Sequence, residues 1–507
     1  MVKPIIDRRL RILLGLLAIA ASVLPALACG GRGGGDVRPD KQKTIVSNTP
    51  DGYEPAVARQ LAHWSGRWQI LQYAFMSRAG NTTTIDSAEM DYFAFLAEHT
   101  GGSDPAMRPS NAGYLLIPYR YGTPSYDTAD NGDFHDFGDE TWTFADSSSG
   151  LDALTSANLV LAEVELARIY HTPSVFGDPE THDFGATQRL HGLLLVEIAK
   201  RQAMHFINNR NSYEVTPEGQ LRMIAALGAL IRVLRQPTFN GTDNRYRDVN
   251  FSGQLLAWMD FFFDEYTDSP APATANGLCD AIVNLGYYVT NTLDSSLRTQ
   301  ATSLIENYAD ALADYQTTDP VEQASRIRGL AEAGRLTFDQ TRYSRITEAF
   351  QSLKNDYRPQ TGVFEGRQNL TAYEVGRIVG ALNAATELAA AFIDTDWAQL
   401  IMSDFIAASL YLGGMYRSTY PPSVLSDYEQ PQNPLYYTFP GLPFNRDTGG
   451  FGTAPSFASR IAQKENAEGW EVENASFDAV GALSLSIELL SLQPSKFYPW
   501  PAVAAAE

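Results

Sequence analysis

Cysteine is almost absent from this chain, which has only Cys29 and Cys279 in 507 residues. So few cysteines exclude a scaffold held together by disulfides. The patterns Cys-x-x-Cys and His-Glu-x-x-His are missing, and the seven histidines are scattered, so the common zinc sites are not expected. There is also no phosphate-binding loop, no dinucleotide fingerprint and no Gly-x-Ser-x-Gly. These absences argue against nucleotide-dependent enzymes and serine hydrolases of that type.

Positive charge is scarce as well. Lysine and arginine number 38 against 59 aspartates and glutamates, which gives a formal net charge of −21. Removal of residues 1–28, which hold four basic residues and one acidic residue, moves this charge to −24. Such a surface repels phosphate backbones and polyanions, so we expect no nucleic acid partner and favour neutral or cationic ligands.

No hydrophobic run is comfortably long enough to span a bilayer, but the N-terminus has the form of an export signal. A basic segment with Lys3 and Arg11 precedes an apolar stretch at 12–27. The junction Ala26-Leu27-Ala28-Cys29 resembles the lipobox of bacterial lipoproteins, with Ala26 where that motif favours Leu. The resemblance implies a lipid on Cys29, attachment to a membrane through that lipid, and a cell-envelope location, at the outer membrane or cell surface. The same residues also fit ordinary signal peptidase, so a soluble secreted product stays open.

The predicted domain organisation follows from this junction. Residues 1–28 are the signal peptide, and the glycine-rich segment 29–50 is a flexible tether. Residues 51–495 form a single domain, followed by a tail at 496–507. Within the domain, Cys279 lies in an apolar stretch, and we expect it to be a small buried side chain without a disulfide partner.

Apolar residues recur at helical spacing through nearly the whole domain. The pattern predicts helices at about 53–79, 86–100, 151–171, 185–208, 216–236, 252–268, 274–291, 294–315, 320–333, 341–355, 371–393, 396–416 and 475–492. Start signals agree with these ranges: Asp319-Pro320, Thr216-Pro217 and a capping box from Thr371 to Glu374. Few segments alternate with period two. The expected class is therefore all-α, built from antiparallel helix pairs.

Two long segments, 101–150 and 417–474, break the helical pattern and are rich in aromatic residues. At the level of architecture, the chain resembles the six-hairpin (α/α) toroid of many glycoside hydrolases and some polysaccharide lyases. That resemblance implies inner and outer helices in alternation, with long loops at one end. The resemblance depends on the number of helices and the placement of the long loops. No family motif is matched, so the resemblance identifies no catalytic residue.

Glycosidic bond hydrolysis needs two carboxyl groups about 5 to 10 Å apart. The candidate catalytic residues are Glu365, in a glycine-bounded turn, and Asp136, Asp139 and Glu140 in the first long segment. Aromatic neighbours would raise a carboxyl pKa by desolvation and stack on sugar rings. The candidate substrate-binding residues are Trp142, Phe144, Tyr428, Tyr436, Tyr437 and Arg367. The alternative for Glu365 is an ion pair with Arg367 in a surface turn.

Asp127, Asp130 and Asp133 are candidate ligands for a structural calcium ion, because they place hard oxygen donors close together near Gly132. Their spacing does not match an EF-hand loop, and a solvated acidic loop is the alternative. No other cofactor is expected.

Three functions stay open at this level. The first is an exported, lipid-anchored protein that binds or hydrolyses a neutral glycan with paired carboxylates, as a glycoside hydrolase or polysaccharide lyase. The second is a surface lipoprotein that captures glycan without catalysis. The third is a structural protein of the envelope.

Overall fold

The computed structural model describes most of the chain from residue 151 onward and parts of the segment before it. The described residues are short stretches between 59 and 84, then 114–122, 124–126, 142–144, 151–171, 184–236, 246–337, 339, 341–359, 361–388, 393–416, 457–465 and 468–492. The chain divides into two units, 1–43 and 44–507, and all described residues belong to the second. The proposed signal, lipidation site at Cys29, and C-terminal tail lie outside the described residues.

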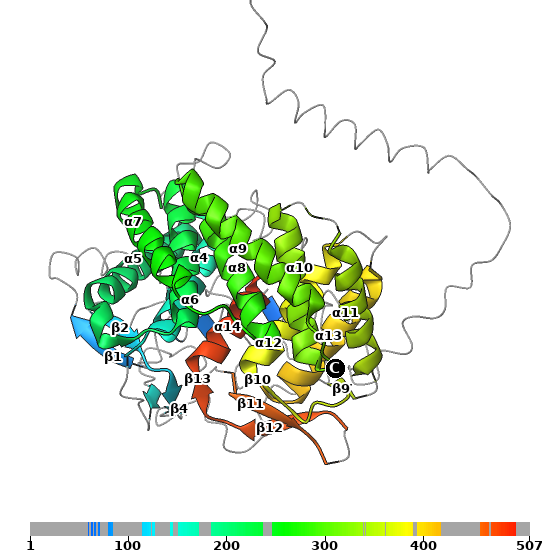
Figure 1. Ribbon diagram of the computed structural model, residues 1–507. Coiled ribbons are helices and arrows are strands. Elements are labelled where there is room, and N and C mark those ends of the chain that lie inside the picture. The colour runs from blue at the N-terminus through cyan, green and yellow to red at the C-terminus, as the bar shows by residue number, and fades with distance from the viewer. Residues whose placement is uncertain are drawn as a thin grey trace, which may run out of the picture. The chain divides into compact units, whose positions relative to one another are not determined.

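The described part is mainly α-helical, which confirms the all-α class (Figure 1). Its α-helices are α4 (Ala153–His171), α5 (Phe184–Asn209), α6 (Pro217–Arg235), α7 (Val249–Thr267), α8 (Ala275–Asn291), α9 (Ser295–Asp314), α10 (Pro320–Thr337), α11 (Tyr343–Asp356), α12 (Ala372–Thr386), α13 (Thr395–Ile406) and α14 (Ala479–Leu490). Each matches a range predicted from periodicity, usually within a few residues. Among the described residues, no helix has the length and apolar content needed to cross a bilayer.

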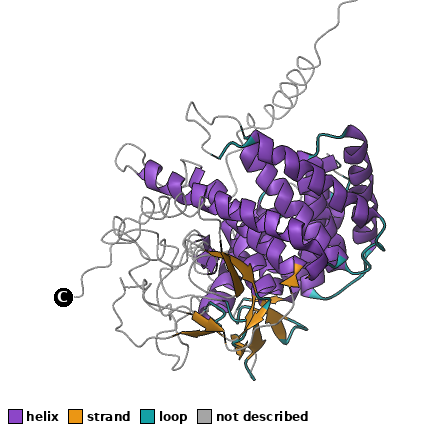
Figure 2. Cartoon of the chain, turned by 90° about the vertical axis from the view of Figure 1, so that its left-hand side faces the viewer, coloured by secondary structure: helices purple, strands orange, loops and turns teal. Residues whose placement is uncertain are grey.

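Short strands gather at one end of the helices (Figures 1 and 2). They are β1 (Gly80–Thr84), β2 (Tyr114–Pro118), β3 (Tyr121–Gly122), β4 (Pro124–Tyr126), β5 (Trp142–Phe144), β6 (Leu151–Asp152), β7 (Tyr213–Glu214), β8 (Tyr357–Arg358), β9 (Val363–Phe364), β10 (Asn369–Thr371), β11 (Arg460–Gln463), β12 (Trp470–Asn474) and β13 (Phe477–Asp478). The largest sheet, β10-β11-β12, is antiparallel, whereas β6 and β7 pair in parallel. Three of these strands end at the residue before a helix begins: β6 before α4, β10 before α12 and β13 before α14.

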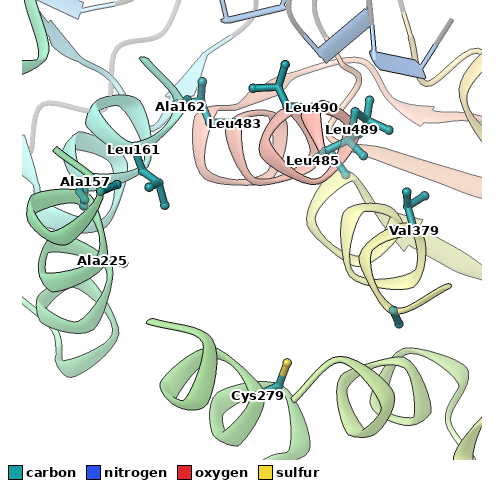
Figure 3. Packing of buried hydrophobic residues seen from close by; sticks show 14 of the residues in the cluster. Ala157, Leu161, Ala162, Ala225, Cys279, Val379, Leu483, Leu485, Leu489 and Leu490 are labelled. Atoms are coloured by element: carbon teal, nitrogen blue, oxygen red, sulfur yellow. The ribbon is translucent and has the colours of Figure 1, made fainter. Parts of the chain in front are cut away.

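Helix packing follows a regular order. The helices α4, α6, α8, α10, α12 and α14 pack each against the next, and α14 packs against α4. Each of the first five also packs against the helix that follows it in sequence, from α5 after α4 to α13 after α12. Figure 3 shows buried hydrophobic side chains that α4, α6, α8, α12 and α14 contribute to the core. Helices that contact neighbours on several sides must be apolar around most of their circumference, which explains the nearly continuous burial of α6 and α12.

The predicted helix starts are confirmed. The Thr216 side chain accepts a hydrogen bond from the Gly219 amide at the start of α6. At the start of α12, the Thr371 side chain accepts from the Glu374 amide while the Glu374 carboxylate accepts from the Thr371 amide. Asp319 caps α10 by accepting from the amides of Val321 and Glu322. Such contacts satisfy amides that have no partner within the helix.

The predicted helix at 396–416 is correct only in part. After α13 the backbone changes to a π-helical segment, η7 (Ala407–Leu412), which ends before Gly413 and Gly414. Gly414 has a φ of 73°, a left-handed conformation that favours glycine. In the segment 417–474, which was expected to be a loop, β11 and β12 were missed because each is short and pairs with residues distant in sequence.

Cys279 lies in the hydrophobic core on α8, fully buried, as predicted (Figure 3). Burial raises the pKa of its thiol to about 12. Because the thiolate is the reactive species, the thiol is unreactive in the folded protein. We therefore expect iodoacetamide at pH 8 to leave Cys279 unmodified in the native protein and to modify it in urea, as measured by mass spectrometry of its peptide. Rapid modification of the native protein would contradict its burial.

Candidate functional site

A polar pocket opens between α4, α6, α8, α12 and α14. Its cavity volume is about 30 Å³, and all the empty space between its lining atoms, with the solvent at its open side included, is about 520 Å³. Five helices that are distant in sequence supply its walls, so only the tertiary structure creates it. The lining residues are Leu154, Asn158, Glu218, Arg222, Asp280, Val283, Asn284, Tyr373, Gly376, Arg377, Val480, Ser484 and Glu488.

The pocket lies at the end of the helices where they begin. Leu154, Glu218, Tyr373 and Val480 each belong to the first turn of their helix. The strand β13, just before α14, pairs with β3 and so brings Tyr121 opposite Asp478. Tyr121 is 48% exposed, and the Arg120 guanidinium lies 5.0 Å from the centre of its ring. An exposed aromatic ring therefore stands beside the start of a helix that lines the pocket.

Asp280, Tyr373 and Arg377 form a tight network on one wall. The Tyr373 hydroxyl and the Arg377 guanidinium both donate to the Asp280 carboxylate. Arg377 Nη1 also lies 2.8 Å from Cys279 Sγ. Burial alone would lower the pKa of Arg377, but Asp280 more than offsets this and raises it, so the guanidinium is charged. Burial, together with Asp280, raises the pKa of the Tyr373 hydroxyl well above its usual value.

Glu218 lies on α6 in a different environment. The residue is exposed, but its carboxyl is surrounded by protein atoms that raise its pKa, and the nearby charge of Asp280 raises it further. Arg120, Arg222 and Arg377 act in the opposite direction without cancelling the effect. Solvent at the open side limits the size of this shift. The pocket thus contains one carboxyl whose pKa is raised, that of Glu218, and a second carboxyl, that of Asp280, which accepts hydrogen bonds from Tyr373 and Arg377.

The other polar side chains are held by partners on neighbouring helices. Arg222 donates from Nε to Asn158 Oδ1 at 2.8 Å and from Nη1 to Asn284 Oδ1 at 3.2 Å. Glu488 lies 3.6 Å from Arg328 of α10, and this contact raises the pKa of Arg328. These contacts tie α4, α6, α8, α10 and α14 together around the pocket.

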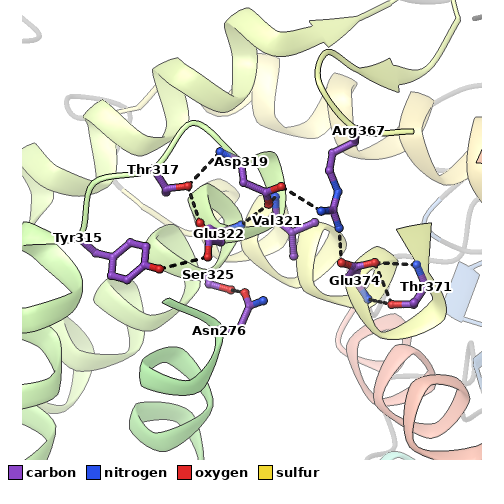
Figure 4. Close-up of polar contacts among 10 residues, drawn as sticks. All are labelled: Asn276, Tyr315, Thr317, Asp319, Val321, Glu322, Ser325, Arg367, Thr371 and Glu374. Atoms are coloured by element: carbon purple, nitrogen blue, oxygen red, sulfur yellow. Dashed lines mark hydrogen bonds and ion pairs between the residues drawn. The ribbon is translucent and has the colours of Figure 1, made fainter. Parts of the chain in front are cut away.

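The structure places the two predicted site residues of the glycine-bounded turn in separate ion pairs. Glu365 is exposed and pairs with Arg358, so the alternative of a surface ion pair is correct in kind but names the wrong partner. Arg367 instead lies between the starts of two helices, where its guanidinium pairs with Asp319 of the α10 cap and with Glu374 of α12 (Figure 4). Neither residue lines the pocket.

The remaining predicted site residues cannot be located as side chains. Trp142 and Phe144 belong to β5, which pairs with β4, but only their backbone is described. Outside the described residues lie Asp127, Asp130, Asp133, Asp136, Asp139, Glu140, Tyr428, Tyr436 and Tyr437. Their roles stay predictions. Within the part of the chain that is described, no group of three histidine, cysteine or acidic side chains is arranged to hold a metal ion.

Sequence reasoning missed the pocket residues, although a signal for them exists. Ten of the thirteen lining residues occur as pairs four positions apart on one helix each: 154 and 158, 218 and 222, 280 and 284, 373 and 377, 484 and 488. Residues four apart share a helix face. Most of these pairs put polar side chains on faces that are otherwise apolar. Such polar pairs on several otherwise apolar helices therefore indicate a shared polar interior.

Comparison with known proteins identifies no relative of this chain. No protein-family model, no curated protein and no solved structure matches the chain.

Proposed function

We propose that the described helices form a six-hairpin (α/α) toroid. The support is the order of packing, in which α4, α6, α8, α10, α12 and α14 contact one another in turn and the last contacts the first. In this arrangement α5, α7, α9, α11 and α13 are outer helices. The predicted helix at 53–79, of which only scattered residues are described, would supply the sixth.

We propose further that the pocket binds a glycan and hydrolyses a glycosidic bond. The observation that carries this proposal is the presence of two carboxyl groups, Glu218 and Asp280, in one pocket and in contrasting environments. Glu218 would donate its proton to the glycosidic oxygen as that bond breaks. Asp280 would stabilise the positive charge that develops on the sugar, either by attacking carbon or by activating water. Tyr121 offers a ring on which a sugar can stack.

The cellular setting is proposed from sequence. Lipidation of Cys29 would hold the domain at the cell envelope, at the outer membrane or surface, with residues 29–50 as a tether. The strongly negative chain favours a glycan that is largely neutral. The pair formed by Glu365 with Asp136, Asp139 or Glu140 stays a separate prediction.

A non-catalytic glycan receptor is the second candidate, and one observation favours it. Both oxygens of Asp280 already accept hydrogen bonds, one from Tyr373 and one from Arg377. A carboxylate held in this way resembles a structural ion pair as much as a catalytic group. The two candidates differ in whether glycan is cleaved.

The test is hydrolysis of a panel of oligosaccharides and polysaccharides by the wild type and by Glu218→Gln. We expect the wild type to release reducing sugar from at least one glycan, and the substitution to lower kcat by about a hundredfold or more, because glutamine cannot donate the proton. Glu306→Gln, at an exposed position of α9, is the matched control and should keep full activity. Binding without cleavage would favour the receptor, and a fully active Glu218→Gln would remove Glu218 from the reaction.

A further inference from the structure

Arg222 is the side chain in the pocket whose contacts leave its charge unbalanced. Both of its hydrogen-bond acceptors are neutral amide oxygens, on Asn158 of α4 and Asn284 of α8. The Asn158 amide is itself oriented, because its Nδ2 donates to the Leu154 carbonyl at 2.9 Å and its oxygen also accepts from Ser484. The guanidinium is therefore held in one position, and its second terminal nitrogen, Nη2, is not used in these contacts.

The other guanidinium groups near the pocket have acidic partners. Arg377 pairs with Asp280, Arg328 with Glu488 and Arg120 with Asp152. Among the described residues, no carboxylate forms an ion pair with Arg222. The acid one turn before it on the same helix, Glu218, has a raised pKa. Arg222 is therefore the one cation lining the pocket that has no ion pair among the described residues.

We infer that the pocket binds a sugar unit that carries one carboxylate, which pairs with Arg222. The inference rests on the proposed function for the sugar and on the contacts of Arg222 for the carboxylate. An arginine with a fixed orientation is well suited to a planar carboxylate, since the pair gains charge-assisted hydrogen bonds of defined geometry. The negative charge of the whole chain opposes a polyanion, but one acidic unit within a largely neutral glycan meets only the local charge of the pocket.

This assignment also gives the bound carboxylate a role in keeping Glu218 protonated. The charged groups that act on Glu218 are Asp280, Arg120, Arg222 and Arg377. The positive charge of Arg222 disfavours the protonated form of Glu218 when the pocket is empty. A bound carboxylate would offset that positive charge, so Glu218 would hold its proton more firmly when substrate is present.

The first test compares four small probes with the wild-type protein by calorimetry or ligand-observed NMR. The probes are D-glucuronate, its uncharged methyl ester, D-glucose and acetate. We expect D-glucuronate to bind at least about tenfold more tightly than the methyl ester and glucose, because only it offers the charge. It should also bind more tightly than acetate, which lacks the ring. Equal affinity for glucuronate and its ester, or the absence of glucuronate binding, would overturn the inference, and equal affinity for acetate would overturn the assignment to a sugar.

The second test assigns the effect to Arg222. Arg222→Gln should lower glucuronate affinity to that of the methyl ester without changing glucose binding. Arg232→Gln, an exposed arginine further along α6 and outside the pocket, is the control and should bind as the wild type does. Unchanged glucuronate affinity in Arg222→Gln would contradict the inference. If that variant does not fold, the wild-type comparison of glucuronate with its ester decides.

These experiments distinguish failure of the carboxylate site from failure of the proposed hydrolysis. Selective glucuronate binding without any hydrolysis would keep this site and reject the reaction. Hydrolysis of neutral glycans by a wild-type protein that binds D-glucuronate no more tightly than its methyl ester would keep the reaction and reject this site.

Discussion

Replacing Asp404 with asparagine is expected to stabilise the protein above pH 7 and to flatten its dependence on pH. Asp404 lies on α13 and is 3% exposed. Its Oδ2 accepts a hydrogen bond from Tyr357, whereas its Oδ1 has no partner among the described residues. Burial raises the pKa of this carboxyl to about 7, despite the opposing effect of the Tyr357 hydrogen bond.

The sign of the effect follows from proton binding in the two states. Below about pH 4, both the folded and the unfolded protein hold this proton. Between about pH 4 and pH 7, the unfolded state loses it and the folded state keeps it, so the free energy of unfolding falls by about 1.4 kcal/mol per pH unit. The loss from this one group reaches about 4 kcal/mol near pH 7 and then stays constant.

Urea unfolding followed by circular dichroism from pH 4 to pH 8 measures this effect. Asparagine cannot ionise, so the difference between Asp404→Asn and the wild type should move by about 4 kcal/mol in favour of the variant across that range. Asp396→Asn, at an exposed position of the same helix, is the control and should change stability by less than about 1 kcal/mol. Parallel pH profiles for Asp404→Asn and the wild type would show that Asp404 ionises normally.

Replacing Arg377 with methionine is expected to destabilise the protein by about 3 to 5 kcal/mol at pH 7. The Arg377 side chain is 7% exposed and that of its partner Asp280 is 19% exposed. Methionine fills much of the same volume but leaves the Asp280 carboxylate without its cation in a poorly solvated place. Removal of one member of a buried pair costs more than the pair contributes, because the remaining charge is uncompensated.

The control for this prediction is Arg345→Met. Arg345 pairs with Glu348 at 3.0 Å on the surface of α11, where the two side chains are 43% and 56% exposed. Its loss should cost no more than about 1 kcal/mol. The double variant Arg377→Met with Asp280→Leu should recover much of the stability lost in Arg377→Met, because it removes both charges. Equal losses for Arg377→Met and Arg345→Met would contradict a buried ion pair at this site.

Local signals predicted the helices well. The periodicity of α6 and the capping residues Thr216 and Thr371 act within a few positions of the chain, so they are visible without tertiary information. The burial of Cys279 was predicted in the same way, from its apolar neighbours. The strands β11 and β12 were missed because their pairing depends on partners outside the local window.

The residues of the candidate site give a weaker local signal. Glu365 lies in a glycine-bounded turn, which is typical of a loop-built site, whereas Glu218 and Asp280 lie within amphipathic helices. Glu365 forms an exposed pair with Arg358, whereas the two helical acids share a pocket. The pKa of Glu218 is raised first by burial and then by the charge of Asp280 on another helix, and no local pattern in the sequence indicates either effect.

The sequence by itself determined the helical class, the start of most helices, the negative charge and the predicted export signal, because each follows from neighbouring residues or from composition. The tertiary structure decided which helix faces meet. Helices far apart in the chain brought Glu218, Arg222, Asp280 and Arg377 around one pocket, where burial and neighbouring charges together altered the proton affinities of Glu218 and Arg377. Electrostatic interactions act through space and depend on local solvation, so the chemistry of the pocket arises only when the chain is folded.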